Sequence, residues 1–195
     1  MDMLLKNTLR MRPDRIIVGE VRGPEASTMF TAMNTGHDGV MGTLHANSAF
    51  ETINRITNPP MNVPYSMLGA LDIIVVLKRI ATPQGLIRVI HEISEISSVS
   101  GNVVRFNPIF KYNPKTKKTE STGIPSRLKP KLAMATGMSA KDINFIIKDR
   151  KRILKRMLEL SKTKTFPPGL LQSIIEKNRS HWLDEKNKSA INRLR

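Results

Sequence analysis

The 195-residue sequence contains no cysteine and only 5% aromatic residues. Without cysteine, the chain forms no disulfide and no thiolate zinc site, a composition that fits a reducing compartment. The longest strongly apolar run, residues 73–77, is far shorter than the ~20 residues that a membrane-spanning helix needs. The first residues also lack the basic start and apolar core of a secretory signal. We therefore expect a cytoplasmic module without a membrane span.

Acidic residues are too few to balance the lysines and arginines of the C-terminal part, which carries nearly all of the net charge of +16. Residues 1–110 contain 10 Lys/Arg and 9 Asp/Glu, whereas residues 111–195 contain 22 and 7. This asymmetry indicates an anionic partner or a strongly solvated tail. The candidate partners are an acidic subunit, an anionic membrane leaflet or nucleic acid. Nucleic acid is the least favoured, because aromatics are few and no nucleic-acid motif is present.

Glu20 stands at the end of a short β-branched run, residues 15–21, which predicts a strand buried on both faces. In open α/β sheets, ligands collect at the carboxyl ends of the strands. A carboxylate there can hold the water shell of a magnesium ion or orient an attacking water. The alternative is an ordinary solvated acid at a strand end.

Two histidines bracket a second apolar stretch, residues 40–44. His37 precedes it in GHDG, and His45 follows it in TLHANS. A histidine at a strand end can donate a hydrogen bond to a phosphate oxygen. Taken singly, either histidine is more often structural or solvent-exposed. Their joint spacing from Glu20 favours a phosphate-contacting set.

These segments resemble the secretion-type P-loop ATPases, the motors of type II and type IV secretion, type IV pili and archaella, and are similar to the archaeal members. The run LLKNTLRMRPDRIIVGEVRGPEA resembles the approach to the Walker B carboxylate, and GHDGVMGTLHANSAFETINRI resembles the histidine box with its following helix. The resemblance covers residues 4–110. It implies a partial RecA-like α/β sheet and a motor that couples ATP hydrolysis, with Mg²⁺, to secretion or filament assembly.

Carried over residue by residue, the resemblance implies roles for four side chains. Glu20 would be the Walker B carboxylate, acting on magnesium through water or on the attacking water. Arg22 would be the basic nucleotide-binding residue after it. His45 would sense the γ-phosphate, with His37 in a supporting position. The resemblance also implies a ring, a hexamer as in the family, and an inner-membrane platform protein that would hold the chain at the membrane periphery.

The phosphate-binding loop of such enzymes is missing from this sequence. No GxxxxGK[ST] occurs in the 195 residues, so the nest and lysine that cradle the phosphates are absent. We expect a C-terminal portion of a motor that is inactive alone and needs a Walker A segment from a partner chain or a missing N-terminal segment. The alternative is a catalytically silent fragment or binding subunit that docks on the motor or the membrane platform through its basic tail. No zinc is expected, because the four-cysteine insertion of bacterial members is also absent.

Two interpretations remain open for each of three further polar residues. Arg10 either reaches a phosphate across a subunit boundary, as an arginine finger does, or is a surface charge at a helix end. Thr43 and Asn47, on either side of His45, either bind phosphate or satisfy the local backbone.

The alternation of helical and extended patterns predicts a mixed α/β sheet that ends in a hairpin, followed by a basic helical region. Ser48 and Glu51 form a capping box for a helix with Phe50, Ile53 and Ile56 on its inner face. We expect a partial RecA-like core at residues 1–112, a linker at 113–130 and the basic helical region at 131–195. The expected helices cover residues 3–11, 25–35, 49–57, a short segment after Pro64, 140–160 and 170–175, and the further strands cover 72–78, 85–97 and 102–112.

Overall fold

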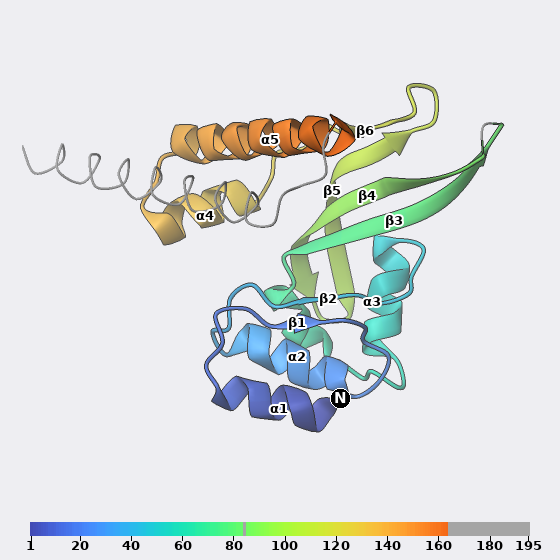
Figure 1. The fold of residues 1–195 in the computed structure, drawn as a ribbon. Coiled ribbons are helices and arrows are strands. Elements are labelled where there is room, and N and C mark those ends of the chain that lie inside the picture. Colours follow the sequence, from blue (N-terminus) through green and yellow to red (C-terminus); the bar gives the residue numbers. More distant parts are fainter. Residues whose placement is uncertain (84, 164–195) are drawn as a thin grey trace, which may run out of the picture. The chain divides into compact units, whose positions relative to one another are not determined.

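The structure is a computed structural model that describes residues 1–83 and 85–163. The chain divides into two compact units, Met1–Gly137 and Met138–Arg195. The first unit contains the six strands found in the described residues, and the second contains the helix α5 (Ala140–Thr163) (Figure 1). None of the described helices is long and apolar enough to cross a membrane.

Two short parallel strands lie in the N-terminal half of the first unit. β1 (Ile17–Val18) pairs with β2 (Met41–Gly42), and α2 (Glu25–Asn34) connects them. Hydrogen bonds extend the pairing on both sides, from Met41 N to Ile16 O and from Val21 N to Thr43 O, each 2.8 Å. The two predicted strands are therefore present, although each is shorter than its apolar run. The prediction that the first is buried on both faces is wrong, because Val18 is buried whereas Ile17 is exposed.

Helices surround this pair of strands and share one apolar core with it. They are α1 (Asp2–Arg10), α2, α3 (Ala49–Thr57) and the 3-10 helix η1 (Tyr65–Ala70). Phe30 and Leu68 are fully buried at the centre of the core, together with Val21 from the segment after β1. The helix expected at residues 25–35 is confirmed as α2, and it buries Ala26 and Met29 beside Phe30.

The predicted capping box starts α3, but one prediction for this helix is wrong. Glu51 N donates to the Ser48 hydroxyl at 3.1 Å, and the Glu51 carboxylate accepts from Asn47 N at 2.7 Å. Ile53 and Ile56 are buried as expected, whereas Phe50 is 66% exposed. Each residue advances a helix by about 100°, so Phe50 and Ile56 lie about 120° apart and cannot both face the centre of one core.

The C-terminal half of the first unit is a four-stranded antiparallel sheet in the order β3-β4-β5-β6. Its strands are β3 (Ile73–Thr82), β4 (Gly85–Ser100), β5 (Val103–Asn113) and β6 (Lys118–Ser121). The predicted hairpin between β4 and β5 is confirmed, with Ser100 opposite Val103. In Figure 1, β3 and β4 run together past the end of β5 to a free tip.

The expectation of one mixed sheet needs correction, because the described strands form two separate sheets. Strands joined by short turns pair with their sequence neighbours, so β3, β4, β5 and β6 form an antiparallel meander. No described strand then joins β1 and β2 to them. The fold is a mixed α/β arrangement of helices with a parallel and an antiparallel sheet.

The stretch expected to be a linker, residues 113–130, contains β6 and the start of α4 (Leu128–Thr136). The sequence does not predict β6 because most of its side chains are exposed and polar. A turn in which Lys117 has a left-handed backbone conformation brings β6 beside β5. α4 tolerates Pro130 because that residue lies in the first helical turn, where the N–H has no intrahelical partner.

The second unit begins as its sequence predicts. Ser139 and Asp142 cap α5 reciprocally, with Asp142 N donating to the Ser139 hydroxyl at 3.2 Å and Ser139 N donating to Asp142 Oδ2 at 2.9 Å. The predicted helix at residues 170–175 lies outside the described residues.

Candidate functional site

Glu20 and His45 lie side by side, just beyond the carboxyl ends of β1 and β2. His45 Nε2 is 2.9 Å from Glu20 Oε1, and Arg22 Nε donates to the same oxygen at 2.6 Å. Parallel pairing produces this arrangement, since the residues that follow both strands emerge at one edge of the sheet. The structure thus brings together three of the four residues that the sequence singles out.

Two supporting residues fix the backbone around Glu20. The Thr43 hydroxyl donates to Gly19 O at 2.5 Å and ties the two strand ends together. The Glu25 carboxylate accepts from Arg22 N at 2.9 Å and from Gly23 N at 3.0 Å. The hydrogen bond from Arg22 N is the main cause that lowers the pKa of Glu25. The sequence interpretation gives Glu25 no role, although an acid in the first turn of a helix is a recognisable capping signal.

The electrostatics keep Glu20 ionised at neutral pH. The hydrogen bond from Arg22 lowers the pKa of Glu20 most, and the charges of Arg22 and His45 add to that effect against partial desolvation. The Glu20 side chain is 34% exposed. Its Oε2 atom accepts no hydrogen bond within the described part of the chain, so one carboxylate oxygen is available to a ligand.

The donor set fits a water-mediated magnesium contact. Carboxylate oxygens suit Mg²⁺, which usually keeps several waters and takes one or two carboxylates plus substrate phosphates. Residues 1–83 and 85–163 contain no group of three or more His, Cys, Asp or Glu that could hold a metal alone. Glu20 therefore fits as a single acidic contact and does not belong to a closed protein cage.

Two hydrogen-bond donors of the site, Arg22 and His45, reach into solvent. His45 is 78% exposed, and Arg22 is similarly open. Both are donors fixed at one end by Glu20, so an anionic group arriving at this edge can meet them without a rearrangement of the backbone.

His37 and Arg10 are not part of this cluster. His37 follows α2, where its N–H donates to Ala32 O at 3.2 Å, and its Nδ1 is buried without a hydrogen-bond partner among the described residues. Arg10 is exposed at the end of α1, and it forms no ion pair within residues 1–83 and 85–163. The supporting role of His37 and the arginine-finger role of Arg10 stay predictions.

Comparison with known families settles the relationship of the chain. The family model described as "Type II/IV secretion system protein" matches residues 1–122, more than half of the chain and the whole of the Glu20 cluster. The chain belongs to this family.

Relatives of this type II/IV secretion family member match parts of longer proteins. The uncharacterized protein MJ1287 of Methanocaldococcus jannaschii is 34% identical over 180 residues, covering 91% of this chain and 65% of the relative. The conjugal transfer protein TrbB of Rhizobium radiobacter is 41% identical over 96 residues, covering 47% of this chain and 30% of the relative. The chain spans less than two thirds of both relatives.

Among solved structures, the chain is similar to the VirB11 ATPase from the Brucella suis type IV secretion system in complex with sulphate. It shares 30% identity over 48% of this chain and 31% of that chain. The TM-score of 0.41 is too low to define the fold.

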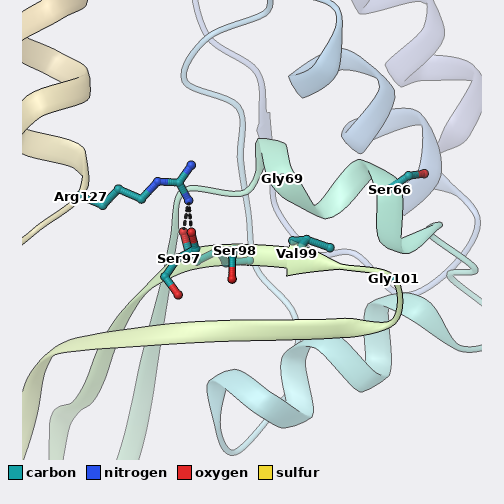
Figure 2. A pocket seen from close by; sticks show the side chains of 8 residues that line it. Ser66, Gly69, Ser97, Ser98, Val99, Gly101 and Arg127 are labelled. Carbon is teal, nitrogen blue, oxygen red and sulfur yellow. Dashed lines mark hydrogen bonds between the residues drawn. The ribbon is translucent and has the colours of Figure 1, made fainter.

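A separate pocket in this family member lies between η1 and the β4–β5 turn (Figure 2). Arg127 Nη1 donates to the carbonyls of Ile96 at 2.6 Å and Ser97 at 2.8 Å, and Arg127 N donates to the buried Glu95 at 2.6 Å. These bonds fasten the start of α4 to β4. None of the four predicted site residues lines this pocket, so we place the candidate site at Glu20 and not there.

Proposed function

We propose that the chain is the C-terminal portion of a motor ATPase that couples ATP hydrolysis to protein secretion or filament assembly. The observation that carries the proposal is the cluster of Glu20, Arg22 and His45 at one edge of a parallel strand pair. Membership of the type II/IV secretion family supports it. Because the sequence contains no GxxxxGK[ST], the site requires a phosphate loop from a partner chain or a longer form of this protein.

In the completed site, bound ATP with Mg²⁺ would supply the phosphoryl group transferred to water. Glu20 would use its free Oε2 to orient water or to hold the magnesium water shell. Arg22 keeps that carboxylate ionised and offers its remaining guanidinium N–H groups to phosphate. His45, held by Glu20 through Nε2, would donate from its second ring nitrogen to a phosphate oxygen only in the doubly protonated form of the ring.

The proposed assembly is a ring, a hexamer as in the family, that works in the cytoplasm at the membrane periphery. The family relationship supports a membrane-embedded platform protein as its partner. The concentration of positive charge beyond residue 110 suits an acidic or anionic docking surface. With no cysteine in the sequence, the proposal includes no zinc.

The experiment is a complementation assay for ATP hydrolysis. The purified chain, a Walker A-bearing polypeptide from the neighbouring gene, and their mixture are each assayed for Mg-dependent phosphate release. We expect turnover only in the mixture, and Glu20→Gln in this chain to lower it by about 10²-fold or more. Glu120→Gln, an exposed acid on β6 outside the site, is the matched control. Turnover by the chain alone would refute its incompleteness, and a mixture without activity would refute the split-enzyme form.

The second candidate is a silent binding subunit, which the missing phosphate loop favours. A silent subunit could stimulate a partner that carries its own complete site. In that case Glu20→Gln and His45→Gln would leave the activity of the mixture unchanged, while removal of residues 138–195 would abolish it.

A further inference from the structure

The β3–β4 hairpin ends in a two-stranded ribbon. β4 pairs with β5 only from Glu92 onward, and the Thr119 hydroxyl of β6 donates to Ile90 O, whereas the pairing of β4 with β3 continues from Lys78–Val89 to Thr82–Gly85. Figure 1 shows the two strands reaching a tip with no third strand beside them. A two-stranded ribbon is marginally stable in water, so the residues of this tip do not owe their pattern to a packed core.

Apolar side chains lie on both faces of the tip. The two outermost apolar pairs are Ile80–Ile87 and Ala81–Leu86. Successive residues of a strand point to opposite faces, so each face of the ribbon carries one of these pairs. Leu86 is 66% exposed, and Leu77 is exposed further back on the ribbon. A hairpin that functions in water alone has no need of apolar surface on both sides.

Cations form a collar directly behind the apolar tip. Arg79 lies opposite Arg88, and Lys78 is the next residue along β3. Residues 73–91 contain these three cations and no Asp or Glu. Like charges directly opposite each other on neighbouring strands are unfavourable, and neither arginine has an ion pair among the described residues. Within residues 1–83 and 85–163, the collar therefore has no anionic partner.

We propose that this hairpin tip inserts into the headgroup region of an anionic lipid surface. Each residue of a strand adds about 3.4 Å, so the tip extends about 10 Å beyond Arg79 and Arg88. That length matches the roughly 5–10 Å to which interfacial segments bury their apolar residues. At this depth the collar of Lys78, Arg79 and Arg88 meets the lipid phosphates, which supply the missing anions.

A lipid surface fits better than the other anionic partners. A protein groove that contacts one face of the ribbon would leave the apolar pair on the other face in water, whereas the lipid interface surrounds both. Nucleic acid would be expected to meet stacking side chains, and residues 73–91 contain no Phe, Trp or Tyr. The lipid proposal also does not depend on ATP hydrolysis.

The first test measures the depth of the tip directly, because the basic C-terminal region could bind anionic vesicles by itself. The chain has no cysteine, so Leu86→Cys and Val103→Cys each give a single site for the fluorophore NBD. Val103 is the control, since it is exposed and, as the first residue of β5, pairs with Ser100 at the end of β4 far from the tip. The vesicles contain equal parts of phosphatidylcholine and phosphatidylglycerol, with and without shallow doxyl-labelled lipid.

We expect the NBD at position 86 to shift to the blue and to be quenched by the doxyl lipid, and the NBD at position 103 to do neither. Vesicle binding with no change at position 86 would overturn the proposal and assign binding to another region. A blue shift without quenching would overturn it in favour of a protein contact. Absence of binding to the anionic vesicles would also overturn it.

The second test removes the collar. Arg79→Gln/Arg88→Gln is expected to lower the vesicle partition coefficient roughly 25-fold, since each basic residue near an anionic surface contributes about fivefold. Arg55→Gln/Arg105→Gln removes the same charge from exposed positions on α3 and at the far end of β5, and less than fivefold loss is expected. Equal losses in the two variants would overturn the proposal. Circular dichroism checks that both remain folded.

Discussion

Arg22 and His45 keep Glu20 ionised, whereas partial desolvation of its carboxylate opposes ionisation. Its Oε1 receives donors from Arg22 and His45, while its side chain stays partly exposed. The folded-state pKa of Glu20 lies below its ordinary value of 4.5. The stabilisation from this ionisation is therefore present above about pH 4.5 and is lost as the pH falls through the lowered pKa.

Arg22→Gln should move the pKa of Glu20 upward, because the hydrogen bond from Arg22 is the first cause of its depression. Carboxyl-carbon NMR titration of the labelled glutamates measures the shift. Arg12→Gln, an exposed arginine that forms no ion pair within the described part of the chain, is the control. An unchanged Glu20 titration in Arg22→Gln would show that the ion pair does not persist in solution.

His91 gives the chain a second pH dependence. Burial of the ring lowers the pKa of His91 most, and the positive charges of Lys78 and Lys111 add to it, with Glu92 opposing. Since the folded pKa lies below 6.5, the unfolded chain binds the proton more readily and stability falls as the pH drops below about 7. We expect His91→Gln to reduce the change in melting temperature between pH 7 and pH 5, measured by circular dichroism. A slope equal to that of the parent chain would contradict this assignment.

Gly39 is required by its backbone and by its neighbour. Its φ is +75°, and a Cβ placed there would lie 1.7 Å from Nη1 of Arg15. Gly39→Ala should therefore lower the free energy of unfolding by about 1–2 kcal/mol, measured by urea titration. Gly19→Ala is the comparison, because a Cβ at that residue would meet no atom within 4 Å and its φ is not positive. Equal costs for the two substitutions would contradict the requirement for a positive φ at Gly39.

At the scale of elements, single carboxylates fasten one segment to the next. Glu25 holds the turn into α2, Glu51 closes the cap of α3, and the buried Glu95 joins β4 to the start of α4. In each case the carboxylate accepts a backbone N–H at or just before a helix start, where such donors have no intrahelical partner. These bonds fix how each helix start joins the segment before it.

Glu95→Ala should be among the more damaging substitutions in the first unit. The carboxylate is fully buried and accepts from Ser126 Oγ at 2.5 Å and from Arg127 N at 2.6 Å. Its removal leaves both donors without this partner, and we expect a loss of about 2–3 kcal/mol in urea unfolding. Glu120→Ala, an exposed acid in the same sheet, should cost under about 1 kcal/mol. Faster amide exchange at the start of α4 in Glu95→Ala would locate the damage there.

At the scale of the whole molecule, the parallel strand pair has an open face. Ile17 and Met41 are register partners and are 71% and 51% exposed. Parallel strands normally have both faces covered, so we propose that another segment covers this apolar pair. This agrees with the proposal that the nucleotide site is completed by a Walker A-bearing segment.

Ile17→Ser/Met41→Ser should raise at least tenfold the concentration of Walker A-bearing polypeptide that gives half-maximal ATP hydrolysis. The reason is that the double substitution removes apolar area from the docking face. The stability of the isolated chain should change little. Phe50→Ser, which removes another exposed apolar side chain from α3, is the control. If the two variants behave alike, the open face is not the contact.

The sequence by itself determines the local features of this protein. The acid after β1 and the histidine after β2, the caps at Ser48 and Ser139, the β4–β5 hairpin and the C-terminal positive charge all follow from short-range patterns. Such patterns suffice because a cap, a turn or a strand end depends on residues within a few positions of one another. The proximity of Glu20 to His45 also follows, because consecutive parallel strands end at the same edge.

Only the tertiary structure decides which segments meet. It separates the strands into two sheets, pairs the polar β6 with β5, exposes Phe50 and gives Glu95 a structural role. It also leaves the β3–β4 tip without a third strand. The physical reason is that pairing partners and burial depend on residues far apart in the chain, whose contacts carry no signal in a local window of sequence.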